Sequence, residues 1–146
     1  MTKVLIATDG SDSAGRALDF AIEFAKRYEA DLHALYVEPE QAPPKALEQF
    51  AKAEHIPNTP SAIYHAISEG ILDHAEDRAK DQGLARVERQ AAHGDPAKAI
   101  VDYATGHGID VVVMGHRGFS ELRGLLVGSV SMKVQAHAPC TVITVR

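Results

Sequence analysis

Three glycines and a serine in the last third of the chain have a spacing that could hold phosphate. They form the pattern Gly-x2-Gly-x9-Gly-Ser directly after a short apolar run: Gly115, Gly118, Gly128 and Ser129. A strand followed by glycines and a helix start can form a concave ring of backbone N–H groups, which attracts anions. Ser131 adds a second hydroxyl at the same helix start. This stretch is therefore predicted to be a phosphate-binding loop.

The glycine pattern differs from two well-known nucleotide-binding loops. A Walker A loop contains Gly-Lys-Ser/Thr, and no such lysine follows these glycines to assist phosphoryl transfer. The Rossmann fingerprint has another glycine spacing and follows the first strand of its fold. Two glycines alone more often serve a turn. The interpretation therefore rests on the hydroxyl residues at the helix start and on a loop between Gly118 and Gly128 that is long enough to cover a ligand.

The elements that must position this loop alternate between strands and helices. Short apolar runs predict strands at 3–8, 31–37, 111–114 and 140–145, and the mixed apolar and charged stretch 85–92 suits a strand near the sheet edge. Apolar residues at helical spacing predict main helices at 14–28, 61–83, 96–107 and 129–137. This alternation predicts an α/β fold, an open five-stranded parallel sheet of order 3-2-1-4-5 with helices on both faces. Such an order brings Asp9 and Gly115 together at the crevice where open sheets bind ligands.

Helix boundaries and buried stripes can also be predicted. Ser11, Ser61 and Asp95 are expected to cap helices, with Pro96 at the first helical position. The first helix is expected to bury one stripe: Ala14, Ala17, Leu18, Ala21, Ile22, Ala25 and Tyr28. The helix after Ser61 is expected to bury residues spaced by four: Ile63, Ile67, Ile71, Ala75 and Ala79.

Residues 38–60 are expected to form the most mobile or variable stretch of the chain. They contain five prolines, and only 45–54 could form a short helix. The stretch leaves the carboxyl end of the second predicted strand, so it could act as a lid, although an ordinary long loop is the simpler interpretation. We expect a variable loop within a single domain that spans residues 1–146.

Composition narrows the classes of function. The 146 residues carry a net charge of −5, which argues against nucleic acid as the main partner. No apolar run reaches the roughly 18 residues of a membrane span, and no signal peptide is evident. Cys140 is the single cysteine, so no intramolecular disulfide can form. These features predict a cytoplasmic protein without a membrane partner.

Two other kinds of site are weakly indicated. The eight histidines are scattered, and only His65 and His74 share a helix face, so solvated side chains are expected instead of a zinc site. A Ser/His/Asp triad could be assembled from Ser129, a histidine and Asp9, but no nucleophile-elbow sequence accompanies it. No catalytic residue is therefore assigned.

The sequence resembles the universal stress protein family across essentially its whole length. The similar segments are VLIATDGS (4–11), LHALYVEP (32–39), HGDPAKAIVDYA (93–104) and the stretch 111–146, including VVVMGHRG, VGSVSMKV and HAPCTVITVR. Members of the family that bind ATP share Gly-x2-Gly-x9-Gly-Ser/Thr, which is complete here. The resemblance implies an adenine nucleotide alpha hydrolase-like fold and an ATP-binding member of the family.

The resemblance also implies roles for individual residues. Ala7, Thr8 and Asp9 would lie beneath the nucleoside, and the backbone of Val37 would contact the adenine edge. Met114 and Gly115 would border the ribose. The phosphates would be held by Arg117, Gly118, Gly128, Ser129, Val130 and Ser131. His116 stands where the family often has a small polar residue. A divalent ion, Mg²⁺ or Mn²⁺, would accompany the phosphates, with Asp9 as its only credible acidic ligand; Arg117 is the alternative source of positive charge.

Several functions are consistent with these residues. The first is a nucleotide-dependent stress-response or signalling module that forms a homodimer, because the apolar last strand, Thr141–Val145, would lie unprotected at a sheet edge. The second is a weak ATPase in the same pocket, although no residue is well placed to activate water. The others are a binder of another adenine nucleotide, such as cAMP, and a ligand-free interaction protein whose glycines are structural.

Overall fold

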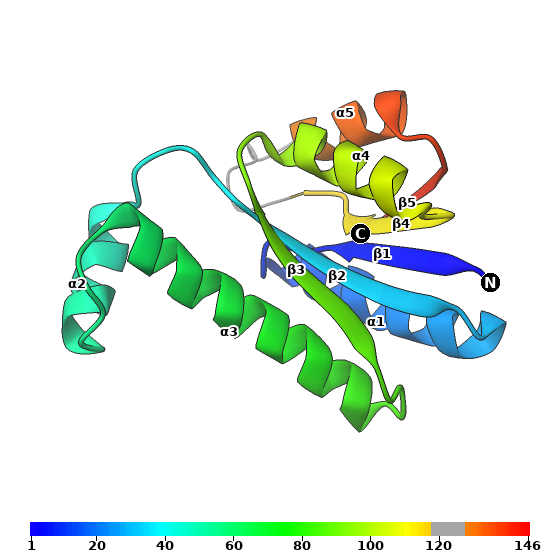
Figure 1. Ribbon diagram of the computed structural model, residues 1–146, viewed down its shortest axis with the longest axis horizontal. Helices are drawn as coiled ribbons and strands as arrows, with labels where there is room; N and C mark the ends of the chain where they lie inside the picture. Colours follow the sequence, from blue (N-terminus) through cyan, green and yellow to red (C-terminus); the bar gives the residue numbers. More distant parts are fainter. Residues whose placement is uncertain (118–127) are drawn as a thin grey trace.

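The computed structural model describes residues 1–117 and 128–146 and shows a parallel sheet between two layers of helices (Figure 1). The strands are β1 (Lys3–Ala7), β2 (Asp31–Glu38), β3 (Val87–His93), β4 (Val111–Gly115) and β5 (Thr141–Val145). The helices are α1 (Asp12–Tyr28), α2 (Lys45–Ala53), α3 (Pro60–Asp81), α4 (Pro96–His107) and α5 (Ser129–His137). The observed strand order, β3-β2-β1-β4-β5, confirms the predicted order.

Strands β1 and β4 form the centre of the sheet. Val4 of β1 lies opposite Leu32 of β2 on one side and Val111 of β4 on the other. Leu5 and Val112, another pair in this register, are both fully buried. Helices cover both faces of these strands, which explains why their sequences are continuously apolar. The adjacent carboxyl ends of β1 and β4 therefore stand on a rigid base.

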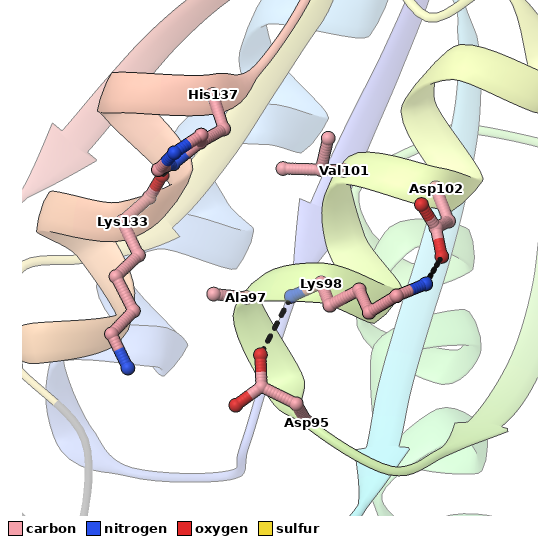
Figure 2. A pocket seen from close by; sticks show the side chains of 7 residues that line it. All are labelled: Asp95, Ala97, Lys98, Val101, Asp102, Lys133 and His137. Carbon is pink, nitrogen blue, oxygen red and sulfur yellow. Dashed lines mark hydrogen bonds and ion pairs between the residues drawn. The ribbon is translucent and has the colours of Figure 1, made fainter.

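Helices α4 and α5 cover one face of the sheet. Ile100 of α4 and Val134 of α5 pack with Leu5, Leu35 and Val112. A groove of about 390 Å³ lies between the two helices (Figure 2). Its lining residues are Asp95, Ala97, Lys98, Val101, Asp102, Lys133 and His137. The charged groups that α4 contributes are engaged within that helix, because Asp95 accepts a hydrogen bond from the Lys98 N–H and Lys98 pairs with Asp102.

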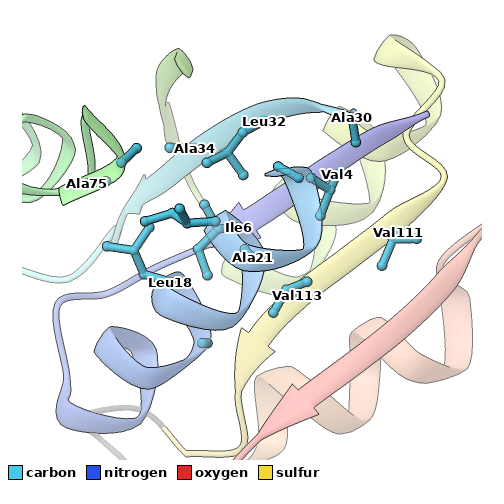
Figure 3. Close-up of a cluster of buried hydrophobic side chains, with 14 of the residues drawn as sticks. Val4, Ile6, Leu18, Ala21, Ala30, Leu32, Ala34, Ala75, Val111 and Val113 are labelled. Atoms are coloured by element: carbon cyan, nitrogen blue, oxygen red, sulfur yellow. The ribbon is translucent and has the colours of Figure 1, made fainter. Parts of the chain in front are cut away.

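Helices α1 and α3 cover the other face. Leu18 and Ala21 of α1 meet Ile6 and Val113 of the sheet (Figure 3), and Leu72 joins the same cluster from α3. Each fully buried aliphatic side chain of this size contributes roughly 1.5–3 kcal/mol relative to an exposed one. Apart from Tyr36, the buried members of the cluster are aliphatic.

Two of the three predicted helix caps are confirmed. Ser11 accepts from the Ala14 N–H, and Asp95 accepts from the Lys98 N–H. The prediction for Ser61 was wrong, because Thr59 caps α3 and accepts from the Ala62 N–H at 3.2 Å. Pro60 then occupies the first helical position, where a missing N–H costs nothing.

The buried stripes differ from the prediction at identifiable positions. Tyr28 is 59% exposed; it follows Phe24 by one turn, and its ring lies tilted against that of Phe24, on the side of α1. On α3, Ile67 and Ile71 are only partly buried, whereas Ser68 and Leu72 are fully buried. A strict spacing of four drifts by about 40° per step around a helix, so such a stripe rotates away from the sheet.

Residues 38–60 and the starts of two strands differ slightly from the prediction. Within residues 38–60 the structure places α2 beside the start of α3, and the Tyr64 hydroxyl donates to the Gln41 carbonyl at 2.8 Å. Strand β3 begins at Val87 instead of Ala85, and β5 begins at Thr141 instead of Cys140. None of the helices in the described part of the chain is long and apolar enough to cross a membrane.

Candidate functional site

The carboxyl ends of β1 and β4 meet as the strand order requires. Ala7 of β1 lies opposite Met114 of β4, and both side chains are buried. Thr8, just past β1, is also buried and donates its N–H to the Leu35 carbonyl of β2 at 3.0 Å. The structure therefore brings the chain at Asp9 next to the chain at Gly115, although the two are far apart in sequence.

The turn from β1 into α1 is held by its own side chains. Thr8 Oγ1 accepts from the Gly10 N–H at 3.2 Å, and Asp9 Oδ1 accepts from the Ser11 N–H at 2.9 Å. Gly10 has a φ of 82°, a conformation that favours glycine. Asp9 is partly exposed, with one carboxylate oxygen committed to the turn. Its orientation is therefore set by the backbone before any ligand binds.

Gly115 is required by packing at this end of β4. A Cβ atom there would clash with Ser13 Oγ and would lie 2.9 Å from the backbone nitrogen of Ala14. The first turn of α1 thus lies directly against the end of β4. The Ser13 hydroxyl secures the contact by donating to the Arg117 carbonyl at 2.6 Å. Sequence reasoning missed Ser13; its one available signal is a small hydroxyl residue two positions after the cap.

The start of α5 is joined to the same end of β4. The buried Ser131 hydroxyl donates to the Gly115 carbonyl at 2.8 Å, and the Gly128 N–H donates to the His116 carbonyl. The hydroxyl of Ser131 is therefore engaged by the protein itself, so this residue can offer a phosphate only its backbone N–H. Ser129 is exposed and Val130 is partly buried.

The first turn of α5 has the features of an anion-binding turn. Its N-cap, Gly128, has no side chain that could accept a hydrogen bond from the N–H groups of the turn. The Gly128 carbonyl accepts from the N–H of Met132, so the helical hydrogen bonds begin there. The positive end of the helix dipole lies at the same place. Within this turn, backbone N–H groups can therefore face a negatively charged ligand.

Arg117 and His116 differ in their hydrogen-bond partners. Arg117 is partly buried, and its Nε has no hydrogen-bond partner among the residues that the structure describes. A buried donor without a partner is costly, so an acceptor is expected to fill this position. His116 is anchored to the end of β5, where the Val145 carbonyl accepts from its N–H at 2.9 Å. Gly118 lies outside the described residues.

Val37 is near the carboxyl end of β2, on the other side of β1 from β4. It pairs with Ala92 of β3 and is partly buried. Its neighbour Tyr36 is buried, which raises the pKa of the phenol to about 12, with the nearby Tyr64, Glu38 and Asp9 adding to the shift. Tyr36 therefore stays neutral, and sequence reasoning did not single it out. Val37 lies at the same carboxyl end of the sheet as Asp9 and Gly115.

The described side chains at the carboxyl end of the sheet do not form a metal site by themselves. Across residues 1–117 and 128–146, no group of three or more His, Cys, Asp or Glu side chains could hold an ion. His65 and His74 are both exposed on α3. Asp9 is the acidic residue at the strand ends that was singled out from sequence. Any ion bound here would depend on a ligand for most of its coordination.

Comparison with known proteins identifies the family. A model of the universal stress protein family matches residues 1–146. The chain belongs to this family. Universal stress protein YxiE of Bacillus subtilis is 35% identical over 151 residues, which cover 99% of this chain and 98% of that protein. Universal stress protein Rv1636 of Mycobacterium tuberculosis is 31% identical over 142 residues, covering 97% and 94%.

Solved universal stress proteins share the fold. UspA from Lactobacillus plantarum superposes with a TM-score of 0.79 at 29% identity, covering 99% of this chain and 97% of that one. A universal stress protein crystallised in complex with cAMP has a TM-score of 0.73 at 31% identity, with the same coverage. The predicted α/β fold is thereby confirmed at the level of the family.

Proposed function

We propose that this universal stress protein binds an adenine nucleotide, with ATP as the preferred ligand, and acts as a nucleotide-dependent stress-response or signalling module. The observation that carries the proposal is the first turn of α5, which has a glycine N-cap and is joined to the end of β4 through Ser131 and Gly115. The related protein crystallised with cAMP supports an adenine nucleotide as the class of ligand.

In this proposal each part of the nucleotide meets a different element. The nucleoside lies over the end of β1 at Ala7, Thr8 and Asp9, and the adenine edge meets the backbone of Val37. Met114 and Gly115 border the ribose. The phosphates are held by Arg117, Gly118, Gly128, Ser129, Val130 and Ser131. Two observations support the phosphate end: Arg117 Nε has no partner within residues 1–117 and 128–146, and the N-cap of α5 is a glycine without a side-chain cap.

Either a divalent ion or Arg117 can neutralise the phosphates. Mg²⁺ is commonly held by one or two carboxylates together with substrate phosphates, and Asp9 could supply one such carboxylate. Mn²⁺ would fit the same ligands. When bound, the ion would offset phosphate charge, with Asp9 orienting it. If Arg117 is the main source of charge, EDTA leaves the ATP affinity within about twofold; a loss of tenfold or more assigns the role to the metal.

The proposal is tested by removing one backbone N–H from the α5 turn. Gly128 has a φ of −71° and a ψ of 157°, values suited to a residue before proline, so Ser129→Pro is compatible with the local backbone. Ser129→Ala is the matched control, because it removes the hydroxyl and keeps the N–H. We expect calorimetry to show ATP binding weakened by about 10- to 100-fold in the proline variant, and less in the alanine variant.

Adenosine separates the two ends of the site. It lacks phosphates, so its affinity should be the same in the wild-type protein and both variants. Equal ATP affinity in wild-type protein and Ser129→Pro would show that phosphate does not meet this turn. Titration of cAMP in parallel ranks the alternative nucleotide against ATP. No adenine nucleotide binding at all would leave the ligand-free interaction protein as the function.

We propose that the protein retains its nucleotide more than it cleaves it, because the sequence has no Walker lysine and offers no evident residue to activate water. A weak ATPase is the alternative, which a phosphate-release assay would detect. We also propose a cytoplasmic homodimer paired through Thr141–Val145, the apolar strand β5 at one edge of the sheet.

A further inference from the structure

Large hydrophobic side chains are exposed at few places in the described part of the chain. They are Met1, Phe20, Tyr28, Phe50 and Met132. Phe20 and Tyr28 lie on α1, and Met132 lies on α5, the two helices that flank the β5 edge on opposite faces of the sheet. Contiguous exposed apolar surface commonly marks an interaction site.

The α1 residues form an aromatic row, which consists of Phe20, Phe24 and Tyr28. They follow one another at intervals of four, and their ring centroids are 6.5 Å and 4.6 Å apart in succession. Phe24 is partly buried against the same cluster as Ile143 and Val145 of β5. The row is therefore continuous along α1, and its middle residue packs against the same cluster as the inward side chains of the edge strand.

Polar contacts show which side of α1 carries this row. Asp19 bonds with Arg78 of α3, and Lys26 donates to the Gln82 carbonyl just after α3, so these residues mark the α3 side. Arg16, one turn before Phe20 in the same row, donates to the Arg146 carbonyl directly after β5. The aromatic row therefore faces away from α3 and runs beside β5.

The β5 edge differs from the opposite edge at β3. Strand β5 reads TVITV without a charge, whereas β3 carries Glu88 and Arg89, and Arg89 is paired with three carboxylates of α3: Glu69, Asp73 and Glu76. Charged residues on an edge oppose pairing with another chain, and β5 lacks this protection. An open apolar edge favours pairing with another strand.

On the α5 side, Met132 is 59% exposed. Lys133 and His137 of α5 line the groove toward α4. Met132 is turned by about 100° from Lys133 around the helix, and Val134 occupies the buried side. Met132 therefore lies on a side of α5 that does not face α4.

We propose that the aromatic row of α1 packs against the same row of a second copy of this chain, which extends an interface made by β5. This inference rests on the proposed pairing through β5. A twofold axis perpendicular to the sheet makes two β5 strands antiparallel and leaves both α1 helices on one face, so each row meets its own copy. Twofold interfaces bring identical patches together in this way. Buried aromatic residues carry much of the binding energy in such contacts.

Positive charges introduced into the aromatic row test its role in the interface. Phe20→Lys with Tyr28→Lys places like charges opposite each other across the axis, and both positions are exposed enough to keep the fold. Phe50→Lys is the matched control, because Phe50 is 52% exposed on α2, away from β5. Sedimentation velocity should show a wild-type dimer, a dimer Kd raised at least about tenfold in the double variant, and no change in Phe50→Lys.

A second variant separates the row from the strand. The N–H of Thr141 donates to the Asp110 carbonyl, and the carbonyl of Val145 accepts from His116, so both residues bond toward β4. Successive residues of a strand alternate in direction, so the N–H and carbonyl of Thr144 point away from β4, toward the open edge. Thr144→Pro removes an outward donor and keeps the β4 ladder. A dimer broken by Thr144→Pro but unaffected by the α1 double variant would overturn the role of the row and keep the β5 pairing. A monomeric wild-type protein at 100 µM or more would overturn both, whether or not ATP binds.

Discussion

At the carboxyl end of the sheet, β4 is joined to α1 and α5 through glycines and serines, whereas at the amino end β1 and β2 are joined to α4 through long polar side chains. The carboxyl-end contacts are Ser13 to the Arg117 carbonyl and Ser131 to the Gly115 carbonyl. Small residues let the backbones of these elements approach closely. The proposed nucleotide site lies at this end.

The amino end is closed by its own residues. Lys3 donates its ammonium to the His107 carbonyl at 3.0 Å, and its backbone N–H donates to Asp110 at 2.8 Å. The buried His33 Nδ1 and the Tyr103 hydroxyl lie 2.9 Å apart, and the His107 ring stacks on Tyr103 at 3.8 Å. The carboxyl end of the sheet is therefore joined by small residues, and the amino end, the sealed end, by long polar and aromatic side chains.

The largest expected effect follows from filling the space at Gly115. Gly115→Ala should destabilise the protein by about 1–3 kcal/mol, because the new methyl group meets the backbone of α1, which cannot move without shifting the helix. Gly70→Ala is the control, since nothing lies within 4 Å of a Cβ there and α3 should gain up to about 1 kcal/mol. Urea unfolding measures both. Equal midpoints for Gly115→Ala and wild-type protein would refute the close approach.

A smaller effect is expected at Ser131. Ser131→Ala removes the buried hydrogen bond to the Gly115 carbonyl and should cost about 1–2 kcal/mol in unfolding free energy, although alanine favours a helix. Ser61→Ala, at an exposed position of α3, should change stability by less than about 0.5 kcal/mol. If the two variants proved equally stable, the link between β4 and α5 would be unimportant for folding.

The smallest effect concerns the sealed end and depends on pH. Burial lowers the pKa of His33, and the positive charges of His107 and Lys3 act in the same direction, against Glu88 and Asp31. The unfolded chain, with a histidine pKa of about 6.5, therefore binds a proton more readily than the folded protein. The contribution of His33 to stability is complete above about pH 6.5 and is lost as pH falls through the lowered pKa of the folded state.

Replacement of His33 by glutamine tests this pH dependence. Glutamine keeps polar atoms near Tyr103 and does not titrate. Between pH 7.5 and pH 5, the unfolding free energy of wild-type protein should fall more steeply than that of His33→Gln, because only the wild-type protein carries the histidine whose pKa is lowered on folding. The remaining histidines are the same in both proteins. Parallel curves would show that His33 does not titrate differently in the folded state. Tyr103→Phe should cost about 1 kcal/mol at pH 7.5.

Much of the fold was predictable because local patterns determine it. Apolar runs located four strands, a mixed apolar and charged stretch located β3, and the strand order followed from the alternation of elements. Helix boundaries failed where a neighbouring proline changed the cap, as at Thr59 and Pro60. The exposure of Tyr28 was missed because its spacing fits both the buried stripe and the aromatic row, and only the packed sheet distinguishes them.

The sequence by itself determined the family, the parallel sheet and the candidate phosphate loop, because periodicity and glycine spacing are local properties of the chain. Only the tertiary structure decided what each residue does within that frame. Gly115 is required by the approach of α1, the Ser131 hydroxyl is committed to a carbonyl, and Arg117 keeps a buried donor without a described partner. These roles depend on distances between segments far apart in sequence, which packing alone sets.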